Sequence, residues 1–190
     1  MKSEHTRRAI LDAALEVFAE SGFRSGSLRQ VADRVGISEA GILHHFDSKK
    51  ALLAEVLRRR DDQSAAEYPE GWPDPETALR APIATVETNV STPGVVELFC
   101  TLAAEATAAS HPAHAYFVAR YDRTRASIEE VFTAMRDRGM LRETVDPATA
   151  SRTVIAILDG AQLQWLLDRD SVDMVALLRS YLTTICDVEL

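Results

Sequence analysis

The amino-acid sequence predicts an all-α fold of about nine helices. Apolar residues recur at helical spacing along nearly all of the 190 residues, and no convincing apolar–polar alternation predicts a strand. Proline and glycine interrupt this pattern at intervals that suit helix ends. A chain of this length can bury a sizeable core in one large or two small domains.

The first helix is expected over about residues 4–21, where Gly22 stops it. A short second helix follows, and Ser27 and Gln30 stand at the spacing of a capping box at its start. Gly36 stands where the chain must leave this helix in a left-handed conformation. The inward-facing residues expected in these two helices are Ile10, Ala14, Val17, Phe18, Leu28, Val31, Ala32 and Val35.

A third helix, also short, is expected after Ser38, which can cap it. Its apolar residues, Ile42 and Phe46, are four positions apart and predict a single inward face. The other side carries small or hydrogen-bonding groups instead of the Glu/Lys mixture typical of a solvated helix. A short helix supported by another, with a thin outer face, suits the major groove of DNA.

The remaining helices are separated by prolines and glycines. The fourth is expected from Lys49 to about residue 66, before a turn or hinge at 68–76. Pro82 is expected to bend the fifth helix or delay its regular start. The later helices are expected over about 76–91, from Thr92 to about 109, from His111 to Arg138, from Asp146 onward, and after a cap at Ser171.

Four stretches follow one another between Thr6 and about Arg60: TRRAILDAALEVFAESGF, SLRQVADRVGIS, a stretch ending HHF, and DSKKALL. In order and spacing they resemble the DNA-binding domain of TetR-type transcriptional regulators. The chain departs from the family at Leu43, where the recognition helix usually has a tyrosine, so a phosphate contact by a phenol is absent there. The resemblance implies a helix-turn-helix DNA-binding domain over 1–47 and a ligand-binding and dimerisation domain over 48–190.

Several residues of the helix-turn-helix are suited to contact DNA. Glu39 could accept a hydrogen bond from a cytosine amino group, and Ala40 could touch a thymine methyl. Lys49 and Lys50 begin a helix, where the dipole disfavours cations, so a phosphate partner is expected; two solvated lysines are the alternative. The resemblance implies a phosphate contact for Lys49. The predicted DNA-contacting residues are Ser27, Arg29, Ser38, Glu39, Ala40, Gly41, His44, His45 and Lys49.

Some of these assignments leave an alternative open. Gly41 fits either close approach of DNA or a packing requirement, and His45 fits either DNA contact or packing on its own domain. Each of the arginines near the helix-turn-helix fits either a phosphate contact or a solvated surface charge. These arginines are Arg7, Arg8, Arg24 and Arg29.

The last two helices are more apolar than a surface helix of a monomer requires. This excess predicts a four-helix bundle with the same helices of a second subunit, and an ordinary core helix is the alternative. The resemblance agrees, since the TetR-type fold dimerises through its last two long helices. The predicted interface residues are Val154, Ile157, Leu158, Gly160, Ala161, Trp165, Leu178, Tyr181, Leu182 and Ile185.

The middle helices are the expected effector region, because they supply aromatic surface and a few polar groups. The resemblance implies a pocket enclosed by helices five to seven and eight; ordinary core packing is the alternative for each residue. The candidate ligand-binding residues are Val86, Asn89, Phe99, Cys100, Leu102, Glu105, Phe117, Tyr121, Gln162 and Trp165.

The net charge of −8 hides an asymmetry. Residues 1–60 hold 11 of the 21 Lys and Arg but only 8 of the 29 Asp and Glu, a net of +3. Residues 61–190 therefore have a net charge of −11, which would repel DNA from that surface. The basic residues are concentrated where the helix-turn-helix is expected.

No cofactor or metal site is expected. His44 and His45 are adjacent and point about 100° apart on a helix, and His111 and His114 have no third ligand nearby, so capping and surface roles are expected for the latter pair. Cys100 and Cys186 are expected to be buried thiols, with a disulfide or redox switch as the alternative. No signal peptide or membrane-spanning run is found, so a cytoplasmic protein without a membrane partner is expected.

Together these features predict a homodimeric transcriptional regulator that binds a near-palindromic double-stranded operator. A repressor released by an unidentified small-molecule effector fits best. The alternatives are a ligand-independent or activating DNA-binding regulator and, more distantly, a helical enzyme on the same scaffold. Enzymatic activity is not expected, because the sequence has no Gly-rich phosphate loop, nucleophile elbow or zinc motif.

Overall fold

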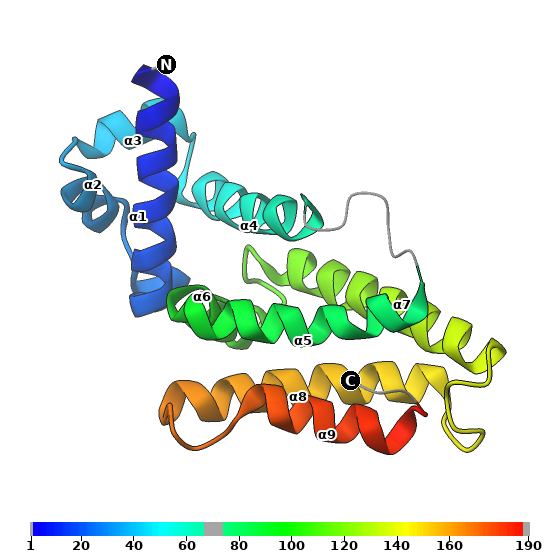
Figure 1. Ribbon diagram of the computed structural model, residues 1–190. Helices are drawn as coiled ribbons and strands as arrows, with labels where there is room; N and C mark the ends of the chain where they lie inside the picture. Colours follow the sequence, from blue (N-terminus) through cyan, green and yellow to red (C-terminus); the bar gives the residue numbers. More distant parts are fainter. Residues whose placement is uncertain (1, 67–73, 188–190) are drawn as a thin grey trace. The chain divides into compact units, whose positions relative to one another are not determined.

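A computed structural model of the chain describes residues 2–66 and 74–187 (Figure 1). Within these residues the protein is helical, and its only β-type pairing is an isolated antiparallel bridge between Leu141 and Cys186. The described helices are α1 (Lys2–Ser25), α2 (Leu28–Val35), α3 (Glu39–His45), α4 (Lys49–Ala66), α5 (Pro75–Ser91), α6 (Pro93–Ala106), α7 (His114–Asp137), α8 (Pro147–Leu167) and α9 (Met174–Ile185).

The chain forms two compact units, and each contains residues distant in sequence. Of the described residues, the first unit contains 2–66 and 97–117, and the second contains 74–96 and 118–187. The end of α6 and the start of α7 therefore pack with the N-terminal helices. The predicted functional boundary after residue 47 stays a prediction, because these units follow packing and not function.

In the first unit α1 packs against both α2 and α4, and α2 packs against α3. Phe18, on the inner face of α1, is fully buried, as is Ile42, the single buried residue of α3. Surface ion pairs join α1 to α4: Arg59 lies 2.8 Å from Asp12, and Arg7 lies 3.0 Å from Glu55. Apolar burial therefore fixes how these helices pack, and the exposed pairs add little.

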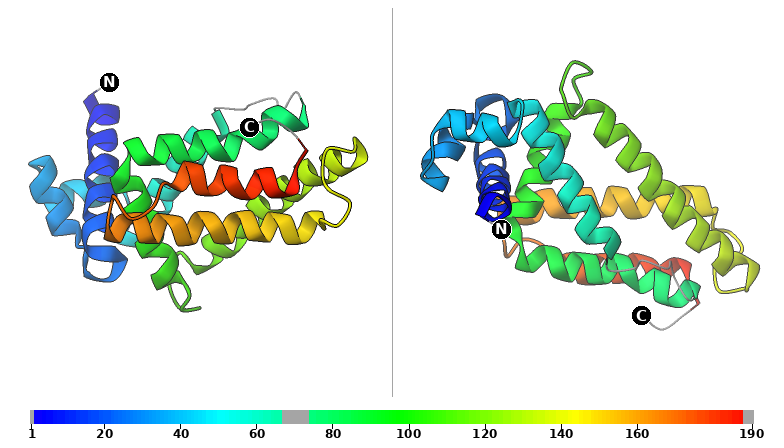
Figure 2. Two further views of the ribbon diagram at one scale, coloured as in Figure 1. Left: turned by 60° about the horizontal axis from the view of Figure 1, so that its bottom comes forward. Right: turned by 90° about the horizontal axis from the view of Figure 1, so that it is seen from above.

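In the second unit α8 and α9 lie side by side, and α9 also packs against α5 (Figure 2). Asp146 and Asp173 cap the starts of α8 and α9, each accepting a hydrogen bond from a backbone N–H in the first turn. The chain after α7 pairs with the chain after α9, since the Arg142 N–H donates to the Ile185 carbonyl at 3.0 Å.

The structure confirms most predicted helices and changes several ends. Ser171 does not cap the ninth helix; its hydroxyl donates to the carbonyls of Gln164 and Asp168, and Asp173 is the cap. The sixth helix ends at Ala106 and the seventh begins at His114, each some three residues inside the prediction. Pro82 lies within α5, which continues through it. Most of the turn expected at 68–76 lies outside the described residues.

Both cysteines are free thiols, Cys186 buried and Cys100 half-buried. Burial, followed by the neighbouring Asp187, raises the pKa of the Cys186 thiol to about 11. At neutral pH this group is therefore protonated and unreactive.

Gly22 turns the end of α1 toward α6. Its φ of 68° and ψ of 173° lie in a region that only glycine adopts readily, and they interrupt the helical geometry of α1. The turn directs the Phe23 N–H to the Glu105 carboxylate, at 2.9 Å. A Cβ atom on Gly22 would lie 2.5 Å from the other oxygen of Glu105. The regular helical geometry of α1 therefore ends at Gly22, as the sequence predicted, although the helix as a whole extends to Ser25.

We expect Gly22→Ala to destabilise the protein more than Gly36→Ala. Both glycines have positive φ, 68° and 74°, but nothing lies within 4 Å of a Cβ on Gly36. The left-handed helical conformation costs about 1–2 kcal/mol for alanine at Gly36. The conformation of Gly22 is one that only glycine adopts readily, and the clash with Glu105 adds to its strain of about 1–3 kcal/mol. Urea unfolding of both variants measures the difference. Equal losses of unfolding free energy would show that the contact with Glu105 does not constrain Gly22.

Candidate nucleic-acid interface

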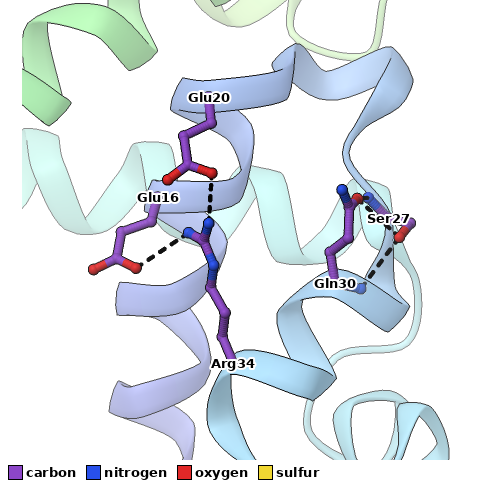
Figure 3. Close-up of polar contacts among 5 residues, drawn as sticks. All are labelled: Glu16, Glu20, Ser27, Gln30 and Arg34. Carbon is purple, nitrogen blue, oxygen red and sulfur yellow. Dashed lines mark hydrogen bonds and ion pairs between the residues drawn. The ribbon is translucent and has the colours of Figure 1, made fainter.

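The start of α2 is fixed by a reciprocal capping box between Ser27 and Gln30 (Figure 3). The Gln30 N–H donates to the Ser27 hydroxyl at 3.2 Å, and the Ser27 N–H donates to the Gln30 side-chain oxygen at 2.7 Å. Two N–H groups that a helix start leaves unpaired are thereby satisfied, which is worth about 1 kcal/mol. The residues proposed from sequence to form this cap do form it.

The turn between α2 and α3 is equally well defined. Gly36, with φ of 74° and ψ of 34°, donates its N–H to the Ala32 carbonyl at 2.9 Å, and the Ile37 N–H donates to the same oxygen at 3.1 Å. Ser38 then caps α3, accepting from the Gly41 N–H at 3.1 Å. These bonds fix the direction of a seven-residue helix that would be unstable alone.

α3 presents most of its residues to solvent. The predicted contact residues Ser38, Glu39, Ala40 and His44 are exposed, while Gly41 and His45 are half-buried. A Cβ on Gly41 would be at ordinary van der Waals distance, 3.5 Å or more, from its neighbours. Packing within the chain therefore does not require a glycine at this position.

Lys49 makes contacts within the chain at the start of α4. Its ammonium lies 4.4 Å from the centre of the Phe23 ring and donates to the Arg24 carbonyl at 3.4 Å. Desolvation by partial burial lowers the pKa of Lys49, and the nearby Glu105 opposes that effect. Arg29 and Lys50 are exposed. The phosphate contact predicted for Lys49 stays a prediction.

Two arginines of this region are engaged by carboxylates of the same chain. Arg34, near the end of α2, pairs with Glu16 and Glu20 of α1, which fastens α2 to α1 (Figure 3). Arg7 pairs with Glu55, and its guanidinium lies 4.9 Å from the centre of the Phe46 ring. Because both guanidinium groups already pair with carboxylates of the same chain, they are less available to phosphates than the exposed Arg8, Arg24 and Arg29.

The candidate ligand-binding residues are divided between the two units. Phe99, Cys100, Leu102, Glu105 and Phe117 belong to the first unit, and in it the rings of Phe99 and Phe117 meet edge to face at 6.0 Å. The others belong to the second unit: Val86, Asn89, Tyr121, Gln162 and Trp165. The pocket that they would form together stays a prediction.

Within the second unit, Tyr121 of α7 donates to the Asp159 carboxylate of α8 at 2.8 Å. Desolvation raises the pKa of Asp159 in spite of this hydrogen bond. Trp165 is buried, and the Arg169 guanidinium lies 3.6 Å from its ring centre. Asn89 is also buried.

His111 is buried, so the surface role expected for it is wrong. Its Nδ1 accepts the Ala113 N–H at 3.2 Å, and its Nε2 lies 3.3 Å from the Glu105 carboxylate. The Phe23 ring meets the imidazole edge to face, with centres 5.3 Å apart. His111 therefore supports the contact between Glu105 and the end of α1.

A pocket of about 210 Å³ lies between α4 and the start of α7 in the first unit. Its walls are mostly apolar, with Lys50 and Arg58 among the lining residues. None of the ten candidate ligand-binding residues lines it. Its other lining residues are Leu53, Ala54, Leu57, Pro112, Ala113 and Tyr116.

Six of the predicted interface residues are buried within their own chain. They form the inner faces of α8 and α9, where the two helices pack: Val154, Ala161, Trp165, Leu178, Leu182 and Ile185. Four others are partly accessible: Ile157, Leu158, Gly160 and Tyr181. The interface itself stays a prediction, and its accessible part is smaller than the sequence indicated.

The outer face of α8 carries an apolar stripe that includes one of the predicted interface residues, Gly160. Ala156, Gly160, Leu163 and Leu167 recur at spacings of four, three and four, so they share one side of the helix. Leu163 is 54% exposed and Leu167 is 80% exposed. On α9, Leu177 is 40% exposed. The apolar residues of α8 outside its inner face are the excess that predicted a subunit interface, although only Gly160 of this stripe is among the predicted interface residues.

Residues 2–66 and 74–187 contain no group of three or more His, Cys, Asp and Glu side chains that could hold a metal ion. In the same ranges, every helix is too short or too polar to cross a lipid bilayer.

The capped two-helix unit with an exposed second helix defines a helix-turn-helix protein, and comparison with known proteins identifies its family. Residues 10–56 match the model of the bacterial regulatory proteins of the tetR family. Residues 75–187, more than half of the chain, match the model of the BetI-type transcriptional repressor C-terminal region. The chain therefore belongs to the TetR family of bacterial regulators.

Individual relatives agree with this family assignment. The chain is 32% identical over 111 residues to the HTH-type transcriptional repressor KstR2 of Rhodococcus jostii, a match that covers 58% of this chain and 48% of that protein. Matches to two other curated regulators of Escherichia coli, UidR and RutR, cover 35% and 46% of their length, so the chain spans less than half of each of these three proteins.

Solved structures show the same fold over nearly the whole chain. A TetR-family regulator from Agrobacterium tumefaciens superposes with a TM-score of 0.80 at 24% identity, over 97% of this chain and 99% of that one. A regulator from Saccharomonospora viridis in complex with choline superposes with a TM-score of 0.79, also at 24% identity, over 97% and 100% of the two chains. At this level of identity the likeness establishes the fold.

Proposed function

We propose that this chain is a cytoplasmic, homodimeric repressor that binds a near-palindromic operator and is released from it by a small molecule. The observation that carries the proposal is the exposed face of α3, on a helix whose start and entry turn are fixed by Ser38 and Gly36. In a helix-turn-helix protein this second helix lies in the major groove. We propose regulation without catalysis, as in the family to which the chain belongs.

In the proposed complex with DNA, some residues contact bases and others contact phosphates. Glu39, Ala40 and His44 face solvent on α3 and would contact base edges. Arg29 and Lys49, at the starts of α2 and α4, would contact phosphates. Phosphate contacts position the protein, and base contacts select the sequence. Lys49 would have to leave the Arg24 carbonyl to reach a phosphate, at a modest cost because that bond is 3.4 Å long.

Dimerisation is proposed through the outer faces of α8 and α9. The stripe of Ala156, Gly160, Leu163 and Leu167 leaves apolar surface exposed on a single chain, and the small residues would let a partner helix approach closely. A twofold dimer would present two copies of α3 to successive major-groove faces, which explains why a near-palindromic operator is proposed.

Release by a ligand requires a connection between the sensor helices and the helix-turn-helix. Within the first unit, Glu105 of α6 accepts the Phe23 N–H at the end of α1 and lies 3.3 Å from the buried His111. A ligand that displaces α6 would move or break this contact, and it can act only by preferring one of the two arrangements. A coupling of about 1–3 kcal/mol would change operator affinity about 5- to 150-fold.

We expect Gly160→Glu to produce monomers that lose operator binding while each chain stays folded. A Cβ atom on Gly160 would meet nothing within 4 Å in the chain, so packing within the monomer does not require glycine there, and the substitution places a charge in the proposed interface. Ala119→Glu, at an exposed position of α7, is the matched control and remains dimeric. Sedimentation measures the mass, and a dimeric Gly160→Glu variant would show that this stripe is not the interface.

Selection of bound duplexes from a randomised library tests operator binding. We expect an enriched near-palindrome; Lys49→Ala then binds every duplex more weakly and lowers the salt slope by about one, because one phosphate contact is lost. Glu39→Ala instead changes the preferred base, by about 1–3 kcal/mol for the affected pair. Altered sequence preference in Lys49→Ala, with an unchanged salt slope, would reverse these roles.

The selected operator also separates the remaining alternatives. Placed before a reporter gene, it lowers expression if the chain is a repressor and raises expression if it is an activator. A small-molecule extract of the cells reduces operator occupancy if the chain is ligand-responsive and has no effect if it is ligand-independent. Failure of the library to yield any preferred sequence would contradict the proposed function itself.

A further inference from the structure

Leu43 is an apolar residue exposed on the surface of α3. It is 43% exposed, and it is the single large apolar side chain of α3 that is exposed. The helix buries only Ile42, which is fully covered by its own domain. Leu43 therefore keeps a large part of its apolar surface in water, and a partner that binds this side of α3 would cover it.

Helix geometry places Leu43 in the middle of the face proposed to meet DNA. Residues of an α-helix are about 100° apart around the axis, so Leu43 projects about 40° from Glu39 and about 60° from Ala40. Ile42, on the covered side, is about 100° away from it. Leu43 and Ala40 therefore form one small apolar surface, flanked by the polar Glu39 and His44.

The chemistry of Leu43 selects among the groups that DNA offers. A leucine side chain has no hydrogen-bond donor for a phosphate and no donor or acceptor for the polar base edges. The major groove has one exposed apolar group, the C5 methyl of thymine. Covering Leu43 with polar edges would leave those edges without partners, whereas covering it with a methyl removes apolar surface of both partners from water.

We propose that Leu43 is a specificity-determining residue that reads a thymine methyl in each half of the operator. This inference rests on the proposed function, because it requires α3 to lie in the major groove. It assigns the preference for thymine to Leu43, with Ala40 beside it, and leaves hydrogen-bonded readout of the neighbouring pairs to Glu39 and His44.

Replacing thymine with uracil in the operator removes the methyl and nothing else. With the full-length protein and the operator selected from the library, each thymine is replaced in turn by deoxyuridine and binding is measured at constant salt. We expect one position in each half-site to lose about fourfold in affinity, the value for one buried methyl-sized group, and about fifteenfold when both half-sites are changed.

Leu43→Ala is expected to bind the thymine and uracil operators equally at that position, because the apolar partner of the methyl has been removed. Leu43→Met retains an apolar side chain and is expected to keep the discrimination, which also shows that the site tolerates substitution. Val118→Ala, at a 50% exposed apolar position of α7, is the control and keeps the wild-type ratio.

The outcomes separate this inference from the proposed function. If the library yields an operator but no thymine-to-uracil change weakens wild-type binding, Leu43 does not read a methyl and operator binding stands. If Leu43→Ala discriminates as well as wild type, another residue reads the methyl and the inference is wrong. If no operator is selected at all, both the proposed function and the inference fail.

Discussion

The hydrogen bond from the Phe23 N–H to the Glu105 carboxylate, 2.9 Å long, holds the end of α1 against the end of α6 across 82 residues of sequence. It depends on the glycine-only geometry of Gly22, which turns the Phe23 N–H outward and leaves no room for a side chain beside Glu105. His111 contacts the same carboxylate and the Phe23 ring, and the Lys49 ammonium lies on that ring. Four elements of the first unit therefore meet at one point.

In the proposed function, this convergence connects the helices that would sense a ligand with the helix-turn-helix. α1 packs against α2 through its apolar face, with Arg34 bridging the two helices at the surface, and α2 packs against α3. A displacement of the end of α6 therefore acts on the base of the helix-turn-helix. A bond to a carboxylate contributes about 1.5–3 kcal/mol, comparable to the coupling that ligand release requires.

The helix-turn-helix could be predicted from the sequence, because the capping box of Ser27 and Gln30 and the turn at Gly36 depend only on residues close to them in the chain. The bond of Glu105 to Phe23 could not be predicted, since no sequence pattern brings residues 82 positions apart together. In α8 both sides are apolar, and spacing alone did not show that inner-face residues such as Val154 are buried within their own chain. Asp173 and Ser171 are both suitable caps, and only the backbone distinguishes them.

The most direct test asks whether this bond links the proposed sensor helices to DNA binding. Hydrogen exchange of the Phe23 amide and operator affinity are both measured in wild type, Glu105→Gln and Glu105→Ala. Glu105→Ala removes the acceptor, so we expect about 10- to 150-fold faster exchange at Phe23 and a parallel change in operator affinity. Glu105→Gln keeps an acceptor oxygen, so we expect its exchange rate at Phe23 and its operator affinity to lie between those of wild type and Glu105→Ala. Unchanged operator affinity in Glu105→Ala, with faster exchange at Phe23, would contradict the account.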